Sequence, residues 1–164
     1  MTTVEVKTHF AQARADPSKL RTLVRTICKR FAVSRAVVSI GIVDDAEMRR
    51  LNRQFLGRRA NTDCLSFDLS DGAGPEKPRV FDLIVNGEMA IREAARRRHA
   101  PKAELALYVA HGLLHQLGFD DATTEDAARM HRMEDEILQD LGYGLVYNTD
   151  SHVDQGSRGV PPRF

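Results

Sequence analysis

The sequence has few of the features that mark exported or membrane proteins. It holds two cysteines in 164 residues, Cys28 and Cys64, too few for a disulfide framework, which favours a reducing compartment. Residues 1–7 lack the charged-then-apolar layout of a secretory signal. No apolar run reaches the ~18 residues that a membrane span requires. We therefore expect a cytoplasmic protein that has no membrane partner.

The chain also lacks a strong charge of either sign. Its 24 Lys and Arg residues nearly balance 23 Asp and Glu residues, and the net charge of +1 gives no overall attraction to nucleic acid. Locally, two basic clusters could neutralise phosphates, although two solvated helix faces would have the same pattern. These clusters are Arg49, Arg50, Arg53, Arg58 and Arg59, and then Arg92, Arg96, Arg97, Arg98 and His99.

Length and composition fit one globular domain, since 42% of the residues are apolar and 29% are charged. Alternating and β-branched apolar residues predict strands over 2–8, 37–43, 65–69 and 80–85. Apolar residues at helical spacing predict helices that begin near residues 17, 45, 88, 101 and 124. The order favours an α/β or α+β domain with a small sheet, followed by a loose tail.

Two histidines four residues apart are the most informative feature. His111 and His115 lie on a predicted helix that is apolar around most of its circumference, so we expect it to be central and buried. Their spacing places both rings on one face, with Cβ atoms about 5–6 Å apart, so that both can bind one metal ion. Gly118 would end the helix and let Asp120 or Asp121 reach the same ion.

The chemistry that this pattern suggests is hydrolysis at a metal with an open coordination position. Two hydrogen-bonded core histidines are the alternative, but the glycine and the aspartates favour a metal. A peptidase helix of the His-Glu-x-x-His type would carry its base where this chain has Gly112, which argues against peptide hydrolysis. A phosphodiester fits better, with Arg58 and Arg59 in a polar loop as candidate phosphate contacts.

Three segments resemble the YbeY family of bacterial endoribonucleases, also called the rRNA maturation factor family. Residues 111–121 read His-Gly-Leu-Leu-His-Gln-Leu-Gly-Phe-Asp-Asp, which is similar to the family's histidine string. Residues 51–67 contain a Leu-Asn step, a basic loop and Thr-Asp-Cys-Leu-Ser-Phe, and residues 87–91 read Gly-Glu-Met-Ala-Ile. Order and separation match the family over about residues 36–143.

This resemblance implies a compact domain, α/β (α+β), with a small mixed sheet of about four strands and a central metal-bearing helix. We assign that domain to residues 1–147 and a flexible C-terminal tail to 148–164. The resemblance also implies metal-dependent, single-strand-specific RNA cleavage in 16S rRNA 3′-end maturation and ribosome quality control. The implied partners are rRNA and the small ribosomal subunit or its proteins.

The family's metal ligands are three histidines, of which His111 and His115 match two. Asp121 stands at the third position, so we expect one Zn²⁺ ion at His111, His115 and Asp121. Two histidines and a carboxylate also suit Fe(II) or Mn(II). We expect the other histidines at the surface, with His131 as a remote substitute ligand; they are His9, His99, His131 and His152.

The chain departs from the family at one functional position. The family usually carries an arginine immediately before the glycine of the basic loop, where this chain has Leu56 before Gly57. Arg58 or Arg59 could reach the same phosphate from a shifted position, or the role could be lost. A non-catalytic ribosome-assembly factor that retains the metal site is therefore the alternative interpretation.

Overall fold

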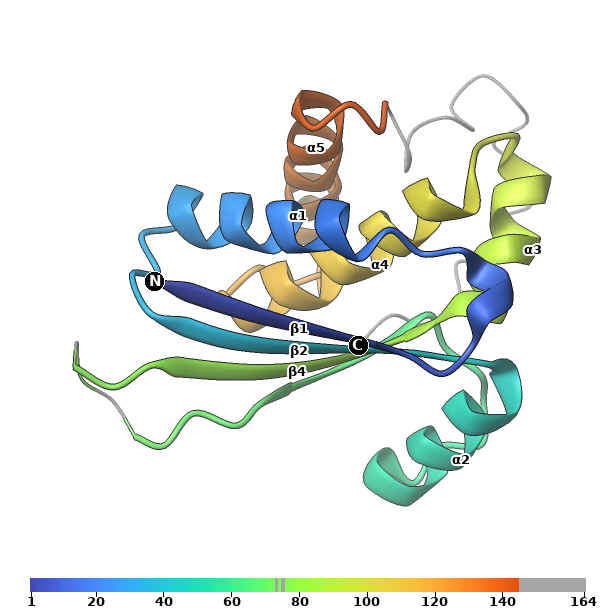
Figure 1. The fold of residues 1–164 in the computed structure, drawn as a ribbon, viewed down its shortest axis with the longest axis horizontal. Helices are drawn as coiled ribbons and strands as arrows, with labels where there is room; N and C mark the ends of the chain where they lie inside the picture. Colours follow the sequence, from blue (N-terminus) through green and yellow to red (C-terminus); the bar gives the residue numbers. More distant parts are fainter. Residues whose placement is uncertain (73, 75, 145–164) are drawn as a thin grey trace.

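A four-stranded mixed sheet organises the protein, seen in a computed structural model that describes residues 1–72, 74 and 76–144 (Figure 1). The strand order is β1-β2-β4-β3. β1, β2 and β4 run parallel, and β3 pairs antiparallel with β4. The bounds are β1 Thr2–Thr8, β2 Ala36–Val43, β3 Cys64–Asp68 and β4 Arg79–Asn86. The expected class and strand number are confirmed, whereas the predicted tail over 148–164 lies outside the described residues.

Helices cover the two faces of the sheet unequally (Figure 1). α1 and α4 lie over one face with α5 crossing them, α3 packs beside α4 at one end, and α2 lies on the opposite face. The bounds are α1 Pro17–Arg30, α2 Asp45–Leu56, α3 Gly87–Arg97, α4 Pro101–Gln116 and α5 Thr124–Asp140, with a short 3-10 turn at Ala11–Ala13. None of the described helices is both long and apolar enough to cross a membrane.

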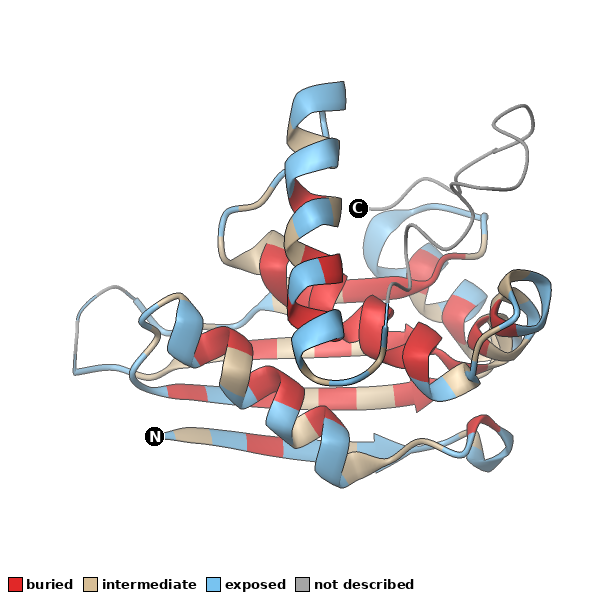
Figure 2. Ribbon diagram, turned by 90° about the horizontal axis from the view of Figure 1, so that it is seen from above, coloured by how far each residue is buried: buried red, intermediate tan, exposed pale blue. Residues whose placement is uncertain are grey.

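The predicted central helix is α4. Every residue from 103 to 114 is buried, and Figure 2 shows the buried class concentrated along this helix and on the strands beneath it. Gly112 permits this close packing, because a Cβ atom there would lie 2.7 Å from Sγ of Cys64 on β3. Cys64 and Cys28 are both fully buried in this core.

The strand predicted over residues 65–69 runs one residue beyond the end of β3. Leu69 continues the apolar alternation of Leu65 and Phe67, but it is 58% exposed. The reason is that β3 ends at Asp68 and that α2 reaches only part of this face, where Phe55 packs against Phe67 with ring centroids 5.4 Å apart.

The helix predicted to begin near residue 88 is α3, which ends at Arg97. The Arg97 side chain is only 10% exposed because it meets a buried acid on α4. His99 Nε2 lies 2.6 Å from Oε1 of Glu104, and Arg97 forms an ion pair with the same oxygen at 3.5 Å. His99 is thus largely buried and not a surface residue, whereas His9 is exposed as predicted, and His152 lies outside the described residues.

Candidate metal centre

The last turns of α4 bring the two histidines against α5. His111 is buried, and its Nδ1 lies 2.6 Å from Oε1 of Glu134 on α5. His115 lies one turn later and is half-buried. Its Nδ1 atom is buried and has no hydrogen-bond partner among the described residues. A buried imidazole nitrogen in that state is suited to an additional ligand, since burying an unsatisfied polar atom is costly.

Gly118 then turns the chain back, as the sequence predicted. It adopts the left-handed conformation with φ of +106°, and the N–H of Phe119 donates to the carbonyl of Leu114 at 3.1 Å. The ring of Phe119 packs edge-on against Phe31, the residue that follows α1, with centroids 5.4 Å apart. This contact anchors the reversal, so that the next two residues lie beside the end of α4.

The two aspartates sit in a short loop that is fixed at both ends. Oδ1 of Asp120 accepts hydrogen bonds from the backbone N–H groups of Asp121 and Ala122, which is an Asx turn. Thr123 then caps α5 by accepting a hydrogen bond from the N–H of Asp126. A capped helix end and a capped helix start therefore hold the acidic loop in place.

The acidic loop brings its carboxylates close to the histidines of α4. One ligand atom each from His115, Asp120 and Asp121 lie within 4.8 Å of one another, and Nε2 of His111 lies 4.0 Å from Oδ2 of Asp121. Two atoms bound to one ion at about 2.1 Å are at most about 4.2 Å apart. The His111–Asp121 distance meets that limit, although His111 is not one of the three residues in the group around His115. These residues could hold a divalent ion, because imidazole and carboxylate suit transition metals.

Arg58 and Arg59 stand apart from this group. They follow Gly57, the C-cap of α2, in the loop that connects α2 to β3. Both are exposed, and within the described chain neither side chain forms a hydrogen bond or ion pair. Their loop is nevertheless anchored, because Nδ2 of Asn52 donates to the carbonyl of Ala60 at 2.6 Å and Nδ2 of Asn86 to that of Thr62 at 3.2 Å.

Ion pairs neutralise much of the second basic cluster. Arg92 forms a bidentate pair with Asp45, and Arg96 pairs with Glu93. Burial alone would raise the pKa of Asp45, but hydrogen bonds from Arg92, Asn86 and Asn61 together hold it well below its usual value. In the first cluster, Arg50 forms an ion pair with Glu47.

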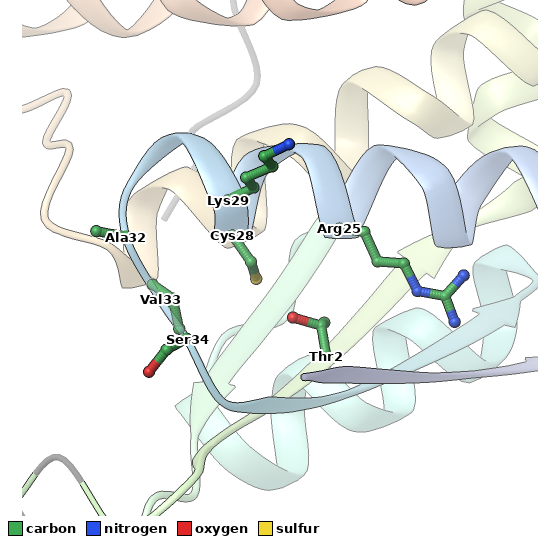
Figure 3. A pocket seen from close by; sticks show the side chains of 7 residues that line it. All are labelled: Thr2, Arg25, Cys28, Lys29, Ala32, Val33 and Ser34. Carbon is green, nitrogen blue, oxygen red and sulfur yellow. The ribbon is translucent and has the colours of Figure 1, made fainter.

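Two cavities in the protein differ in how close they lie to the metal centre. The larger, of about 400 Å³, lies between the end of α1 and the start of β1, and it shares no residue with the centre (Figure 3). The thiol of Cys28 points toward Thr2 there, and burial raises its pKa, which keeps it protonated and unreactive. The smaller cavity, of about 280 Å³, borders the acidic loop and is lined by Asp120, Asp126 and Arg129 among others. The charged side chains of the smaller cavity therefore make it the better candidate for a binding site beside the metal centre.

Sequence reasoning missed one residue of this centre and misplaced another. Glu134 was not predicted. It lies four residues after Met130 and three before Ile137, so its carboxylate is on the apolar face of α5. That misfit with the helical pattern is the signal that could have identified it. His131 is also largely buried, with 13% of its side chain exposed and Nδ1 3.1 Å from Oε2 of Glu134, so its expected place at the surface is wrong.

Comparison with known proteins agrees with this arrangement. The family model "Endoribonuclease YbeY" matches residues 5–142. Endoribonuclease YbeY of an Anaeromyxobacter species is 38% identical over 140 residues, 85% of this chain and 72% of the relative. That of Myxococcus xanthus is 34% identical over 142 residues, 85% of this chain and 48% of the relative.

A solved structure shows the same fold. The solution structure of TM1509 from Thermotoga maritima superposes with a TM-score of 0.56 at 21% identity, covering 96% of this chain and all of the other. The match of the family model extends from β1 to the end of α5 and includes both histidines and the acidic loop. This chain therefore belongs to the YbeY family of endoribonucleases.

Proposed function

We propose that this protein is a metal-dependent, single-strand-specific endoribonuclease that matures the 3′ end of 16S rRNA and takes part in ribosome quality control in the cytoplasm. Its partners in this proposal are rRNA and the small ribosomal subunit or its proteins. The observation that supports the proposal is the group formed by His115, Asp120 and Asp121 at the end of a buried helix, whose ligand atoms lie within 4.8 Å of one another. Membership of an endoribonuclease family supports the reaction class.

In this proposal His111, His115 and Asp121 hold one Zn²⁺ ion or another divalent transition metal. The bound ion would polarise a phosphoryl oxygen and lower the pKa of a coordinated water. The chain contributes two imidazoles that are fixed on one helix and a carboxylate that is fixed by the capped loop. Because Gly112 is packed against Cys64, no side chain at that position can act as a base.

The remaining chemistry falls to Asp120 and the basic loop. Asp120 is exposed beside the other ligand atoms, so its free carboxylate oxygen can accept a proton from a water or from the substrate's 2′-hydroxyl. Arg58 and Arg59 are exposed on an anchored loop and are the candidate phosphate contacts.

Cleavage of a defined RNA tests the proposal. The purified, metal-loaded chain should cut single-stranded RNA and leave a duplex of the same sequence intact. His115→Ala should abolish cleavage, since it removes a ligand. His9→Ala is the matched control, because His9 is exposed outside the site and should retain activity. Equal cleavage by wild type and His115→Ala would refute the proposed reaction.

A second candidate is a ribosome-assembly factor without catalysis. It is favoured by Leu56, which stands where the resemblance implies a functional arginine and which is 41% exposed. Under this alternative, no RNA would be cleaved and ribosome co-sedimentation would survive His111→Ala. Leu56→Arg discriminates further: a rise in cleavage rate would indicate that an active centre lacks only this arginine.

A further inference from the structure

One fully buried acid beside the metal centre, Glu134, is neither a proposed metal ligand nor a proposed base. Glu134 of α5 has no exposed side-chain surface, and its two oxygens face two different histidines. Oε1 lies 2.6 Å from Nδ1 of His111, and Oε2 lies 3.1 Å from Nδ1 of His131. We propose that Glu134 is a positioning residue that fixes the tautomer and orientation of His111, and that His131 holds Glu134 in place. This role rests on the proposed metal centre.

The contact between Glu134 and His111 selects one protonation pattern. In the proposed arrangement Glu134 is ionised and can only accept hydrogen bonds, so Nδ1 of His111 is the donor. A neutral imidazole protonated at Nδ1 carries its lone pair at Nε2. Nε2 is the atom that lies 4.0 Å from Oδ2 of Asp121. The hydrogen bond therefore presents the metal-binding nitrogen to the acidic loop.

Burial makes this contact difficult to replace. A carboxylate removed from water is costly unless several donors satisfy it, and histidines on both oxygens meet that requirement here. His131 lies one turn before Glu134 on α5, and its ring stacks on that of His111 with centroids 6.5 Å apart and planes 18° apart. The two rings and the carboxylate thus hold α5 and α4 in fixed register beside the centre. His131 is a support in this arrangement and not a substitute ligand.

Metal affinity of the full chain tests this role directly. Titration of metal-free protein with Co²⁺, followed by the visible absorption of the bound ion, measures affinity without any activity assay. Glu134→Gln preserves shape but removes the charge, and we expect about 10–100-fold weaker binding. His131→Phe keeps a ring but no donor, so a smaller loss in the same direction is expected. Glu136→Gln is the matched control, because Glu136 is 54% exposed on the same helix and should bind as wild type.

Thermal unfolding of the metal-free variants separates positioning from simple stabilisation. A Glu134→Gln protein that is folded and binds Co²⁺ as tightly as wild type would overturn the role, whether or not its melting temperature falls. Weaker binding by a folded Glu134→Gln variant, with Glu136→Gln unchanged, would establish it. A wild-type chain that binds no divalent ion would overturn the proposed function as well, so the two failures are distinguishable.

Discussion

Gly112 offers a sharp test of how α4 is seated on the sheet. In the substitution Gly112→Ala, the added Cβ would lie 2.7 Å from Sγ of Cys64 and 3.3 Å from Cδ2 of Leu83. Favourable contacts between such atoms occur at about 3.5–4.0 Å, so the overlap with sulfur is about 1 Å. Cys64 is fully buried, and it cannot turn toward solvent to relieve the overlap.

The expected cost follows from two opposing effects. Overpacking a core costs about 1–3 kcal/mol, and an overlap with a buried atom belongs in the upper part of that range. Replacing glycine by alanine inside a helix returns about 1 kcal/mol. We therefore expect Gly112→Ala to lower the free energy of unfolding by about 1–2 kcal/mol. For a chain of this size that corresponds to a fall of about 2–8 °C in melting temperature.

A double-mutant cycle with Cys64→Ala checks the cause. This second change removes the sulfur that Gly112→Ala would strike, so the two substitutions together should cost less than the sum of the single ones, by about 1 kcal/mol or more. Urea unfolding of the four proteins measures the difference. Strict additivity, or a Gly112→Ala protein more stable than wild type, would refute the close packing of α4 on β3.

Two further predictions concern charged groups. Asp45→Asn should lower stability at pH 7 by about 1–2 kcal/mol, because it weakens hydrogen bonds to a charged group. The folded pKa of Asp45 is held low, so its contribution is present above the unfolded value of about 4 and is lost as pH falls through the folded value. Urea unfolding at pH 7 and pH 3 should show the gap to wild type narrowing in acid; a constant gap would contradict this. For RNA binding, Arg58→Ala and Arg59→Ala should each reduce the salt dependence of affinity by about one unit of slope, whereas Arg96→Ala, already paired with Glu93, should change it less. Equal slopes in all the variants would remove the basic loop from the interface.

Local patterns predicted most of the fold because they depend on neighbouring residues. Helical spacing identified α4, and Gly118 identified its end, since a left-handed glycine is a local requirement. The strand order β1-β2-β4-β3 was not predicted, because strand pairing joins residues far apart in the sequence. The same limit explains Leu69, whose exposure depends on how far α2 extends over the sheet.

In the candidate site, too, local features could be predicted from the sequence and contacts between distant residues could not. One helix and the turn after it contain His111, His115 and Asp121, so the sequence alone could suggest these residues as a set. Their role as metal ligands and the metal itself stay predictions. The support from Glu134 depends on α5 crossing α4, and it joins residues 23 positions apart. No periodicity within either helix encodes that crossing, so the misfit of Glu134 on the apolar face of α5 could mark a buried acid but not its partner His111.

In the proposed metal centre, one ion is held by two imidazoles and at least one carboxylate at the end of α4. X-ray absorption at the metal edge, measured on purified chain loaded with zinc and freed of excess ion, reports these ligands. We expect a first shell of mixed nitrogen and oxygen, with the scattering pattern of two imidazole rings at about 2.0–2.1 Å that falls to one ring in His115→Ala. A shell without imidazole, or the same two-ring pattern in His115→Ala, would contradict it.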